Sequence, residues 1–518
     1  MTSPSLNRET TVHEFVLNFF GATEYQGATP GKIAPPAFKN LRNVEITKKG
    51  SLKTRRGFAN WSVHATPDPG NAWATHAVSC IDPSQFIDIV AVSFRGTGNV
   101  YYEHFPSGAW QVLTTMAQLP GYMYARGYDP SGNVVLYLVN GYGGKLVSVR
   151  YGTGTTRDIG YDSGAFTSAL GCAWFLDRLW VLGANSAGTL KGSAVGNDIS
   201  YSASDSVSLN LRQDTSAIRY GNMAVYQNRL YCALGSELLV VTGETAASFG
   251  IEKICTVQGM IVSTLMTAGP YLFWVDLSGV WRYDGGYPVN VGLSMIDQWE
   301  DHDISKDLYG CTTSVDPTAG IYSILFPDSW LASGSGNGKR WNYYYNMNIW
   351  TVDTFPANKV SVLGTSFPYY GLFNKGAGLL GGMAGEVFVE SSATLTDDGT
   401  TITSSIRTGE INLASFANPS EPSANAVVKR ILIDAIPQSA GSYTITMTMT
   451  IDGTAQTAQT LTISAGSTTD TPRRSIISLP THVSGTYHRF TITISDSNGL
   501  VRGELVNVII QFETKSKY

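Results

Sequence analysis

Strand pairs rich in aromatic and aliphatic residues recur along this chain, and they constrain its fold more than any other feature. Each pair has a short polar turn between two apolar runs, as in residues 173–183, 224–243 and 269–286. A repeat of about 40 to 50 residues is the length of one four-stranded blade of a β-propeller. Helical solenoids would need a 3.6-residue hydrophobic period, which these segments lack. The pattern therefore predicts a β-propeller.

Turn signals divide the central part of the chain into units of similar length. Asp-Pro steps at Asp82, Asp129 and Asp316 each precede an apolar run, as in a turn that leads into a strand. We expect about six blades within residues 66–398, and residues 366–395 either complete the last blade or begin a seventh. The expected units are residues 71–120, 121–165, 166–215, 216–262, 263–308 and 309–365.

The pattern changes near the C-terminus, where strands rich in threonine and serine alternate with apolar positions. Residues 442–453 and 487–499 each place apolar side chains on one face and hydroxyl groups on the other. This alternation is typical of half-buried antiparallel strands. With further apolar runs at 429–436 and 506–513, it predicts an antiparallel β-sandwich over residues 399–518. The expected fold class is all-β, a propeller followed by this sandwich.

Composition agrees with an all-β chain. Of 518 residues, 54 are glycine and only 14% are charged, while 27 tyrosines, 20 phenylalanines and 11 tryptophans suit pleated surfaces. The five cysteines never form a Cys-x-x-Cys pair, so they predict neither a disulfide framework nor a zinc site. Residues 1–20 lack the features of a targeting signal, and the most apolar long window, residues 259–277, is interrupted by Gly269-Pro270. We expect no membrane span.

Side chains suited to catalysis are sparse. The densest titratable cluster, Glu300 to Asp303, is continuous in sequence, and neighbours on a loop point in different directions, so it predicts a solvated loop. Residues 333–340 resemble a phosphate-binding loop, but Arg340 stands where a hydroxyl that holds magnesium is required. We therefore predict no catalytic residue, no metal site and no cofactor, and expect that the chain is not an enzyme.

A basic hairpin over residues 43–58 is unusual in a chain of net charge −5. We expect residues 1–65 to form an N-terminal arm, with this hairpin contributing to closure of the propeller. Two interpretations stay open: its cations face solvent or a neighbouring subunit, or they contact a nucleic-acid backbone locally. The acidic balance excludes a bulk electrostatic nucleic-acid binder. The candidate contact residues are Arg42, Lys48, Lys49, Lys53, Arg55 and Arg56.

The hairpin also carries a resemblance to a known family. The order Asn43-Val44-Glu45-Ile46, then Gly50-Ser51-Leu52 and finally Arg55-Arg56-Gly57-Phe58 resembles the start of tail hub or nozzle proteins of short-tailed bacteriophages. Later segments agree with that family, namely Asn228 to Tyr231, Ser278 to Gly285 and residues 343–355. Arg56 departs from the family pattern, which has a proline at that place.

The resemblance implies a structural virion protein of the phage tail, made in the host cytoplasm. Such a subunit would form a hexameric ring below the portal and adaptor proteins and contact spikes, fibres or a distal tip. Packaged double-stranded DNA would pass through its channel without sequence recognition, which an acidic conduit favours because it repels phosphates. A few cations at one level would retain the DNA end until ejection.

A second function belongs to another class, a carbohydrate-binding or carbohydrate-active propeller of lectin or glycosidase type. Aromatic side chains would then serve as platforms on which sugar rings stack, although aromatic residues in strands are more often part of a core. The candidate platforms are Trp110, Trp180, Trp274, Trp281 and Trp350.

Overall fold

The computed structural model describes most of the chain and divides it into two compact units. Unit 1 comprises residues 1–57, 346–353 and 392–518, and unit 2 comprises residues 58–345 and 354–391. The described residues are 12–17, 38–47, 50–60, 74–81, 87–93, 99–105, 109–115, 123–139, 144–184, 188–211, 221–261, 264–293, 311–326, 339–356, 360–367, 379–382, 387–391, 394–420, 423–466, 471–479, 483–496, 499 and 501–515.

Unit 2 contains four sheets of the same design, each with four antiparallel strands in which every strand pairs with the next one along the chain. The strands of these sheets are β10 (Met123–Tyr128), β11 (Val134–Val139), β12 (Val147–Arg150), β13 (Thr156–Asp158); β14 (Gly171–Phe175), β15 (Arg178–Leu182), β16 (Thr189–Gly192), β17 (Val207–Asn210); β18 (Gly221–Tyr226), β19 (Arg229–Leu234), β20 (Glu237–Thr242), β21 (Gly250–Thr256); β22 (Met266–Ala268), β23 (Tyr271–Asp276), β24 (Gly279–Tyr283) and β25 (Val289–Asn290). The expectation of an all-β chain with repeated strand pairs is confirmed.

The remaining strands of unit 2 lie before and after these four sheets in the chain. Strand β30 runs parallel to β6, with Thr365 opposite Val78, so the two ends of the unit meet in one sheet. Strand β5 adds to β32 on the far side of β31. The strands are β5 (Gly57–Asn60), β6 (Ala74–Ile81), β7 (Ile87–Ser93), β8 (Asn99–Phe105), β9 (Gln111–Thr115), β26 (Thr312–Asp316), β27 (Ile321–Phe326), β28 (Lys339–Tyr344), β30 (Val360–Phe367), β31 (Leu379–Gly382) and β32 (Val387–Ser391).

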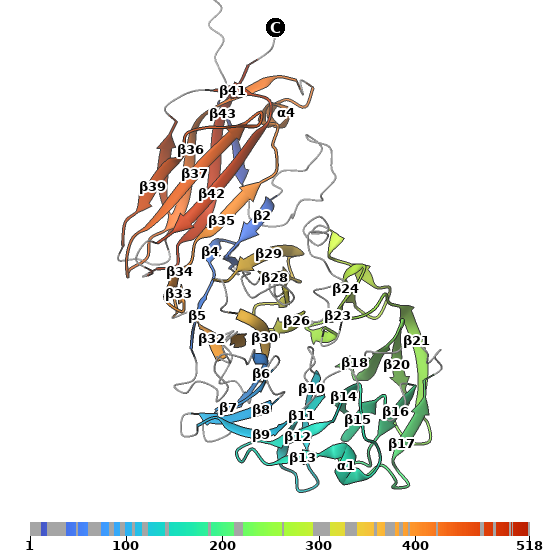
Figure 1. Cartoon of the computed structure of the whole chain (residues 1–518). Helices are drawn as coiled ribbons and strands as arrows, with labels where there is room; N and C mark the ends of the chain where they lie inside the picture. The colour runs from blue at the N-terminus through green and yellow to red at the C-terminus, as the bar shows by residue number, and fades with distance from the viewer. Residues whose placement is uncertain are drawn as a thin grey trace, which may run out of the picture. The chain divides into compact units, whose positions relative to one another are not determined.

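Successive sheets of unit 2 pack face to face. Tyr102 of β8 shares a buried cluster with Leu136 of β11, and Tyr137 on the opposite face of β11 packs into the cluster that contains Trp180 of β15. Because side chains alternate between the faces of a strand, each sheet contributes to the core on both of its sides. Figure 1 shows the sheets following one another in a circuit, from blue strands through green to gold.

Two-residue turns explain the recurring Asp-Arg-Leu and Asn-Arg-Leu motifs. Leu176 and Asp177 have φ of 50° and 52°, and Gln227 and Asn228 have φ of 47° and 56°. Positive φ at both central residues is the geometry of the hairpin turn whose twist matches the flanking strands. The polar residues in these turns therefore set the register of β14 with β15 and of β18 with β19.

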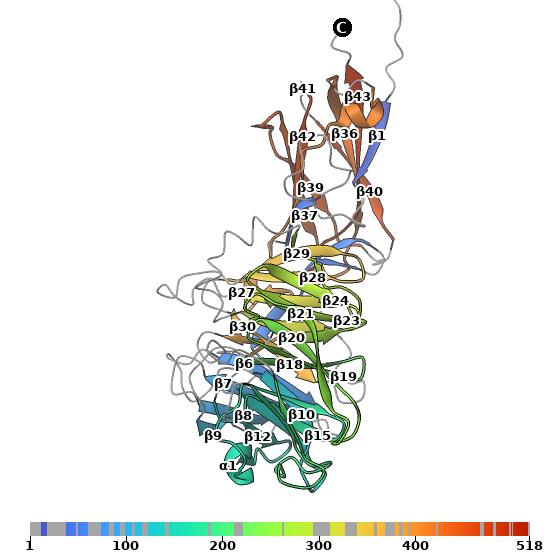
Figure 2. The ribbon, with the colours of Figure 1, turned by 90° about the vertical axis from the view of Figure 1, so that its right-hand side faces the viewer.

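Unit 1 contains two antiparallel sheets. One has the order β3-β4-β43-β36-β40, with β1 also on β43 and β41 on β36, and the other joins β2, β35, β42 and β37, with β38 and β39 on β37. Figure 2 shows β36, β43, β1 and β40 in one layer and β37, β39 and β42 in the other. The strands are β1 (Val12–Leu17), β2 (Phe38–Arg42), β3 (Val44–Ile46), β4 (Leu52–Thr54), β29 (Ile349–Thr354), β33 (Thr396–Asp397), β34 (Thr400–Thr401), β35 (Ser404–Thr408), β36 (Asn425–Ile436), β37 (Tyr443–Ile451), β38 (Thr454–Ala455), β39 (Gln459–Ile463), β40 (Arg473–Ser478), β41 (Ser484–Gly485), β42 (His488–Ser495) and β43 (Glu504–Lys515).

The alternation predicted for the C-terminal strands appears in their burial. Along β42, Phe490, Ile492 and Ile494 are buried, and the threonines between them are only partly covered. Two short helices occur among the described residues, α1 (Ile159–Ser163) in unit 2 and α4 (Leu413–Ala417) in unit 1. Neither they nor any other helix in this part of the chain is long and apolar enough to cross a membrane.

Candidate functional site

The basic hairpin forms where the sequence predicts it. Strands β3 and β4 pair, with Val44 opposite Thr54 and Ile46 opposite Leu52, and Gly50 takes the turn with a φ of 81°. Val44, Ile46 and Leu52 are buried. Strand β4 then pairs with β43, so the hairpin belongs to the sheet of unit 1.

The six candidate cations have different surroundings. Lys48 and Lys49 lie outside the described residues, and Arg42 is exposed on β2. The Lys53 Nζ lies 3.5 Å from the Glu504 carboxylate, and the Arg56 Nε lies 2.9 Å from the Glu45 carboxylate. The Lys53 and Arg56 side chains therefore already pair with acidic groups of their own chain.

Arg55 lies in the interior of unit 1. Its side chain is 1% exposed, and its guanidinium donates to both carboxylate oxygens of Asp397, with an Nη1–Oδ1 distance of 2.8 Å. Its Nε lies 3.7 Å from the Asp353 carboxylate and donates to the Asn43 Oδ1 at 3.3 Å. This buried arginine joins β29, the hairpin and β33, and its partners leave it no access to a phosphate.

A second ion-pair network supports the hairpin. Arg502 donates to the Thr54 carbonyl at 2.7 Å and to the Glu45 carboxylate at 2.7 Å. Burial alone would raise the pKa of Glu45, but Arg502 and Arg56 together lower it to about 2. Glu45 therefore stays ionised over the whole physiological range and fixes the positions of both arginines.

Gly57 shows why the motif after the hairpin requires a glycine. A Cβ at this position would lie 2.2 Å from the carbonyl oxygen of Thr396, which is closer than real Cβ contacts allow. The backbone of Gly57 also donates to the Thr394 carbonyl at 2.9 Å. The structure thus gives packing roles to the residues that carried the family resemblance.

Most of the candidate sugar platforms lie in cores. Trp110, Trp180, Trp274 and Trp350 are all less than 8% exposed, and Trp281 is partly buried and donates to Asp276 at 3.0 Å. An aromatic ring with no exposed face cannot stack on a sugar. The four buried tryptophans were therefore wrong as platforms, because the surrounding chain encloses their rings.

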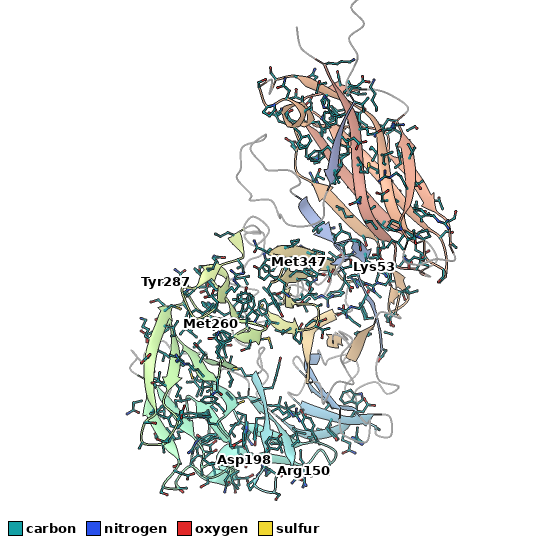
Figure 3. The ribbon with its side chains drawn as sticks, turned by 180° about the vertical axis from the view of Figure 1, so that it is seen from behind. Lys53, Arg150, Asp198, Met260, Tyr287 and Met347 are labelled. Atoms are coloured by element: carbon teal, nitrogen blue, oxygen red, sulfur yellow. The ribbon has the colours of Figure 1, made fainter. Side chains whose placement is uncertain are left out.

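A polar cluster that the sequence analysis did not single out lies between two neighbouring sheets of unit 2. Asp198, labelled in Figure 3, is fully buried in the loop between β16 and β17. Its Oδ2 accepts a hydrogen bond from the Tyr137 hydroxyl at 2.8 Å and from Arg157 at 2.5 Å. Its Oδ1 is buried and has no hydrogen-bond partner among the described residues.

The pKa values of two carboxyl groups in this cluster shift in opposite directions. Burial raises the pKa of Asp198 against the lowering effect of Tyr137 and Arg157. For Asp129, in the turn between β10 and β11, burial acts the same way but is outweighed by hydrogen bonds from Asn133 and Ser131, so its pKa is lowered. The electrostatic influence of Arg157 reaches both carboxyl groups.

Aromatic rings adjoin these charges. Trp174 of β14, which is partly exposed, stacks on Tyr137 with ring centroids 5.9 Å apart and planes within 4°. Tyr128, at the end of β10 and 45% exposed, meets the Trp174 ring edge-on at 6.2 Å. Gly127 permits this approach, since a Cβ there would lie 2.4 Å from Trp174. The Asp-Pro step at Asp129 was the one sequence signal in this region, and it indicated only a turn.

The described residues contain no group of three or more histidine, cysteine, aspartate or glutamate side chains that could hold a metal ion. Glu300 to Asp303 lie outside the described residues. The polar cluster around Asp198 is therefore the candidate functional site.

Comparison with known proteins returns solved structures only, since no family model and no curated protein matches the chain. An exo-beta-1,3-galactanase from Phanerochaete chrysosporium is 8% identical, with 87% of this chain and 99% of that chain covered and a TM-score of 0.25. A glycoside hydrolase family 43 arabinoxylan arabinofuranohydrolase from Bacillus subtilis is 9% identical, with coverage of 88% and 98% and a TM-score of 0.27. A dihydro-heme d1 dehydrogenase is 11% identical, with 63% of each chain covered and a TM-score of 0.34.

These matches correct two expectations, the hub or nozzle function and the absence of enzymatic activity. One is an exo-beta-1,3-galactanase and the other a glycoside hydrolase family 43 arabinoxylan arabinofuranohydrolase, and neither is a tail protein. At these TM-scores, the likeness carries no substrate and no reaction over to this chain. None of these findings tests the family resemblance, the expected partners, the virion location or the expected domain boundaries. These four stay predictions.

Proposed function

We propose that this protein is a carbohydrate-active β-propeller protein that binds a saccharide at the Asp198 cluster. The observation that carries the proposal is the placement of two accessible aromatic rings beside a positioned cation and two carboxyl groups. Tyr128 and Trp174 supply ring faces and edges for the apolar side of a sugar, while Arg157 and Asp129 supply a donor and an acceptor for its hydroxyl groups.

The buried network prepares this surface for a ligand. Arg157 is 26% exposed at its side chain, but its Nη2 is held by Asp198, so the guanidinium is positioned before a ligand arrives. Tyr137 is held in turn by Asp198 and by the Tyr128 carbonyl at 3.0 Å. A rigid arrangement binds better because less conformational entropy is lost on association.

The fold assignment behind this proposal is finer than an all-β chain. We infer that the sheets of unit 2 are propeller blades and that unit 1 is a β-sandwich. The number of blades is close to the expected six, and β30, β31, β32 and β5 form a further blade. Face-to-face packing of successive sheets and the parallel pairing of β30 with β6 support the propeller. The two sheets of unit 1 and the alternating burial along β42 support the sandwich.

The test is a glycan array followed by calorimetry on whatever binds. Tyr128→Ala is expected to weaken binding about tenfold, which corresponds to ~1.4 kcal/mol. Tyr161→Ala is the matched control, because this ring is 83% exposed on α1 and lies outside the cluster. Failure to bind any glycan, or equal losses in the two variants, would contradict the proposal.

Release of reducing sugar from each bound glycan is the second readout. Asp198 is fully buried, so it can act on a bound saccharide only through Arg157, which it positions. If a bound saccharide is cleaved, Asp198→Asn is expected to weaken binding as well as to lower the rate, because Asp198 positions Arg157 and Tyr137. Binding without cleavage would restrict the proposal to recognition.

A further inference from the structure

Arg150 of unit 2 is an arginine whose charge the described part of the chain leaves unpaired. It is the last residue of β12 and is labelled in Figure 3. Its side chain is partly exposed, and its guanidinium has no hydrogen bond and no ion pair with any described residue. An arginine side chain carries five N–H donors and a permanent positive charge. The described residues therefore leave the whole binding capacity of Arg150 to a ligand.

Strand pairing places Arg150 on the same face of its sheet as Arg157. Arg150 lies opposite Val135, and Tyr137, two residues further along β11, lies opposite Ser148. Ser148 in turn lies opposite Arg157. Val135 and Tyr137 both pack into the core that this sheet shares with β14 and β15. Because directly opposed residues share a face, the two arginines project from one face, with their Cβ atoms about 7 to 8 Å apart.

The two carboxylates of the polar cluster are already engaged. Asp198 is fully buried and accepts a hydrogen bond from Arg157 Nη2. Asp129 accepts hydrogen bonds from its own turn, including two from the Asn133 side chain at 3.0 Å. Asp198 therefore balances the charge of Arg157, whereas Arg150 has no adjacent anion among the described residues.

From this arrangement we propose that the saccharide bound at the Asp198 cluster carries an acidic group held by Arg150 and Arg157, which rests on the proposed function and specifies its ligand. Two like charges on one face repel each other, and an anion between them removes that cost. Arg157 uses only Nη2 for Asp198, so its other nitrogens remain available to the ligand. A carboxylate, as in a uronic acid, accepts paired N–H bonds from a planar guanidinium. A sulfate ester offers the same charged oxygens, and the test separates the two.

The exposed aromatic ring of the site lies at the same end of the sheet as Arg150. Tyr128 ends β10 opposite Val134, and Arg150 lies opposite the next residue, Val135. Strands β10 and β12 flank β11, so their backbones are about 10 Å apart. A sugar ring in contact with Tyr128 therefore holds its substituents within reach of the long Arg150 side chain.

A glycan array of matched pairs tests the acidic group. Oligogalacturonate is compared with its methyl ester, and a sulfated galactan oligomer with its desulfated form, so that the members of each pair differ in charge. We expect the full-length protein to bind the acidic member of a pair at least about tenfold more tightly. Equal or tighter binding of the neutral members would overturn this inference and leave the proposed function standing. A protein that binds no glycan would overturn both.

Two substitutions of Arg150 show whether it supplies the preference and which acidic group it binds. Arg150→Gln is expected to weaken binding of the acidic glycan about tenfold and to change the affinity for its neutral counterpart by less than about twofold. Arg150→Lys keeps the charge but loses the planar pair of donors, so it should retain binding of a sulfated glycan better than binding of a uronate. Arg229→Gln is the matched control, since Arg229 is exposed on β19 of another sheet. A preference for acidic glycans that survives in Arg150→Gln would overturn the assignment.

Discussion

Replacing Arg55 by methionine tests whether the basic hairpin has a structural role. Arg55 and Asp353 are each 1% exposed at the side chain, and Asp397 is 5% exposed. The Arg55→Met protein keeps a side chain of similar length but leaves two buried carboxylates without their cation. Breaking a buried ion pair from one side costs about 3 to 5 kcal/mol, mostly from the uncompensated charge. We expect a loss of that size in the free energy of unfolding of unit 1.

The assay must report on unit 1 alone, because a chain with two compact units does not unfold in a single two-state step. Hydrogen exchange of peptides from β36 and β43, measured along a urea series, gives the local free energy of opening. Lys53→Met is the matched control. Lys53 is 27% exposed and pairs with Glu504 at 3.5 Å, and such a pair contributes at most about 1 kcal/mol.

Two outcomes distinguish the interpretations of the hairpin. If the Arg55→Met loss exceeds the Lys53→Met loss by about 2 kcal/mol or more, Arg55 acts inside the fold. An Arg55→Met/Asp397→Asn protein should then recover part of the loss, because one uncompensated charge is gone. Equal and small losses of unfolding free energy in the two variants would refute the reasoning and indicate that Arg55 acts at the surface.

Two further predictions concern unit 1. His488 is fully buried, and burial lowers its pKa to about 4. The neutral form is favoured in the folded state, so this contribution is complete above the ordinary pKa of about 6.5 and is lost as the pH falls toward 4. The free energy of unfolding of unit 1 should fall with it, by up to about 3 kcal/mol, which lowers the urea midpoint, and His488→Leu should flatten that dependence. A wild-type midpoint equal at pH 7 and pH 4 would contradict this. Gly57→Ala should cost about 1 to 3 kcal/mol through its clash with Thr396, whereas Gly286→Ala, in an exposed turn, should cost little, as thermal melts of the two variants would show.

The strand pairs and their turns were predictable from the sequence because their information is local. Aromatic and β-branched runs at 224–243 and 269–286, each with a polar turn, predict two hairpins wherever they lie in the fold. The alternation along β42 is equally local, since successive side chains of a strand point to opposite faces. These features need no knowledge of which strands become neighbours.

The surroundings of the charged groups could not be predicted in the same way. Arg55 and Asp397 are separated by 342 positions, and the sequence shows Arg55 only as one of several cations in a basic hairpin. The burial of Arg55 shows that it is not a surface cation, because its guanidinium is enclosed with two carboxylates and is inaccessible to a ligand. The tryptophans expected as sugar platforms became core residues for the same reason.

The sequence by itself determined that the chain is all-β, that its strands come in repeated hairpins, and that a basic hairpin precedes them. Tertiary structure alone decided that Asp198 meets Tyr137 and Arg157 between two sheets, and that β3 and β40 end the strand order of one sheet in unit 1. Hairpins arise from contacts between residues close in sequence, whereas sites and edges arise where distant segments are brought together by packing. The sequence of such a chain therefore predicts its strands and turns, whereas the residues of its sites are identified only from the folded structure.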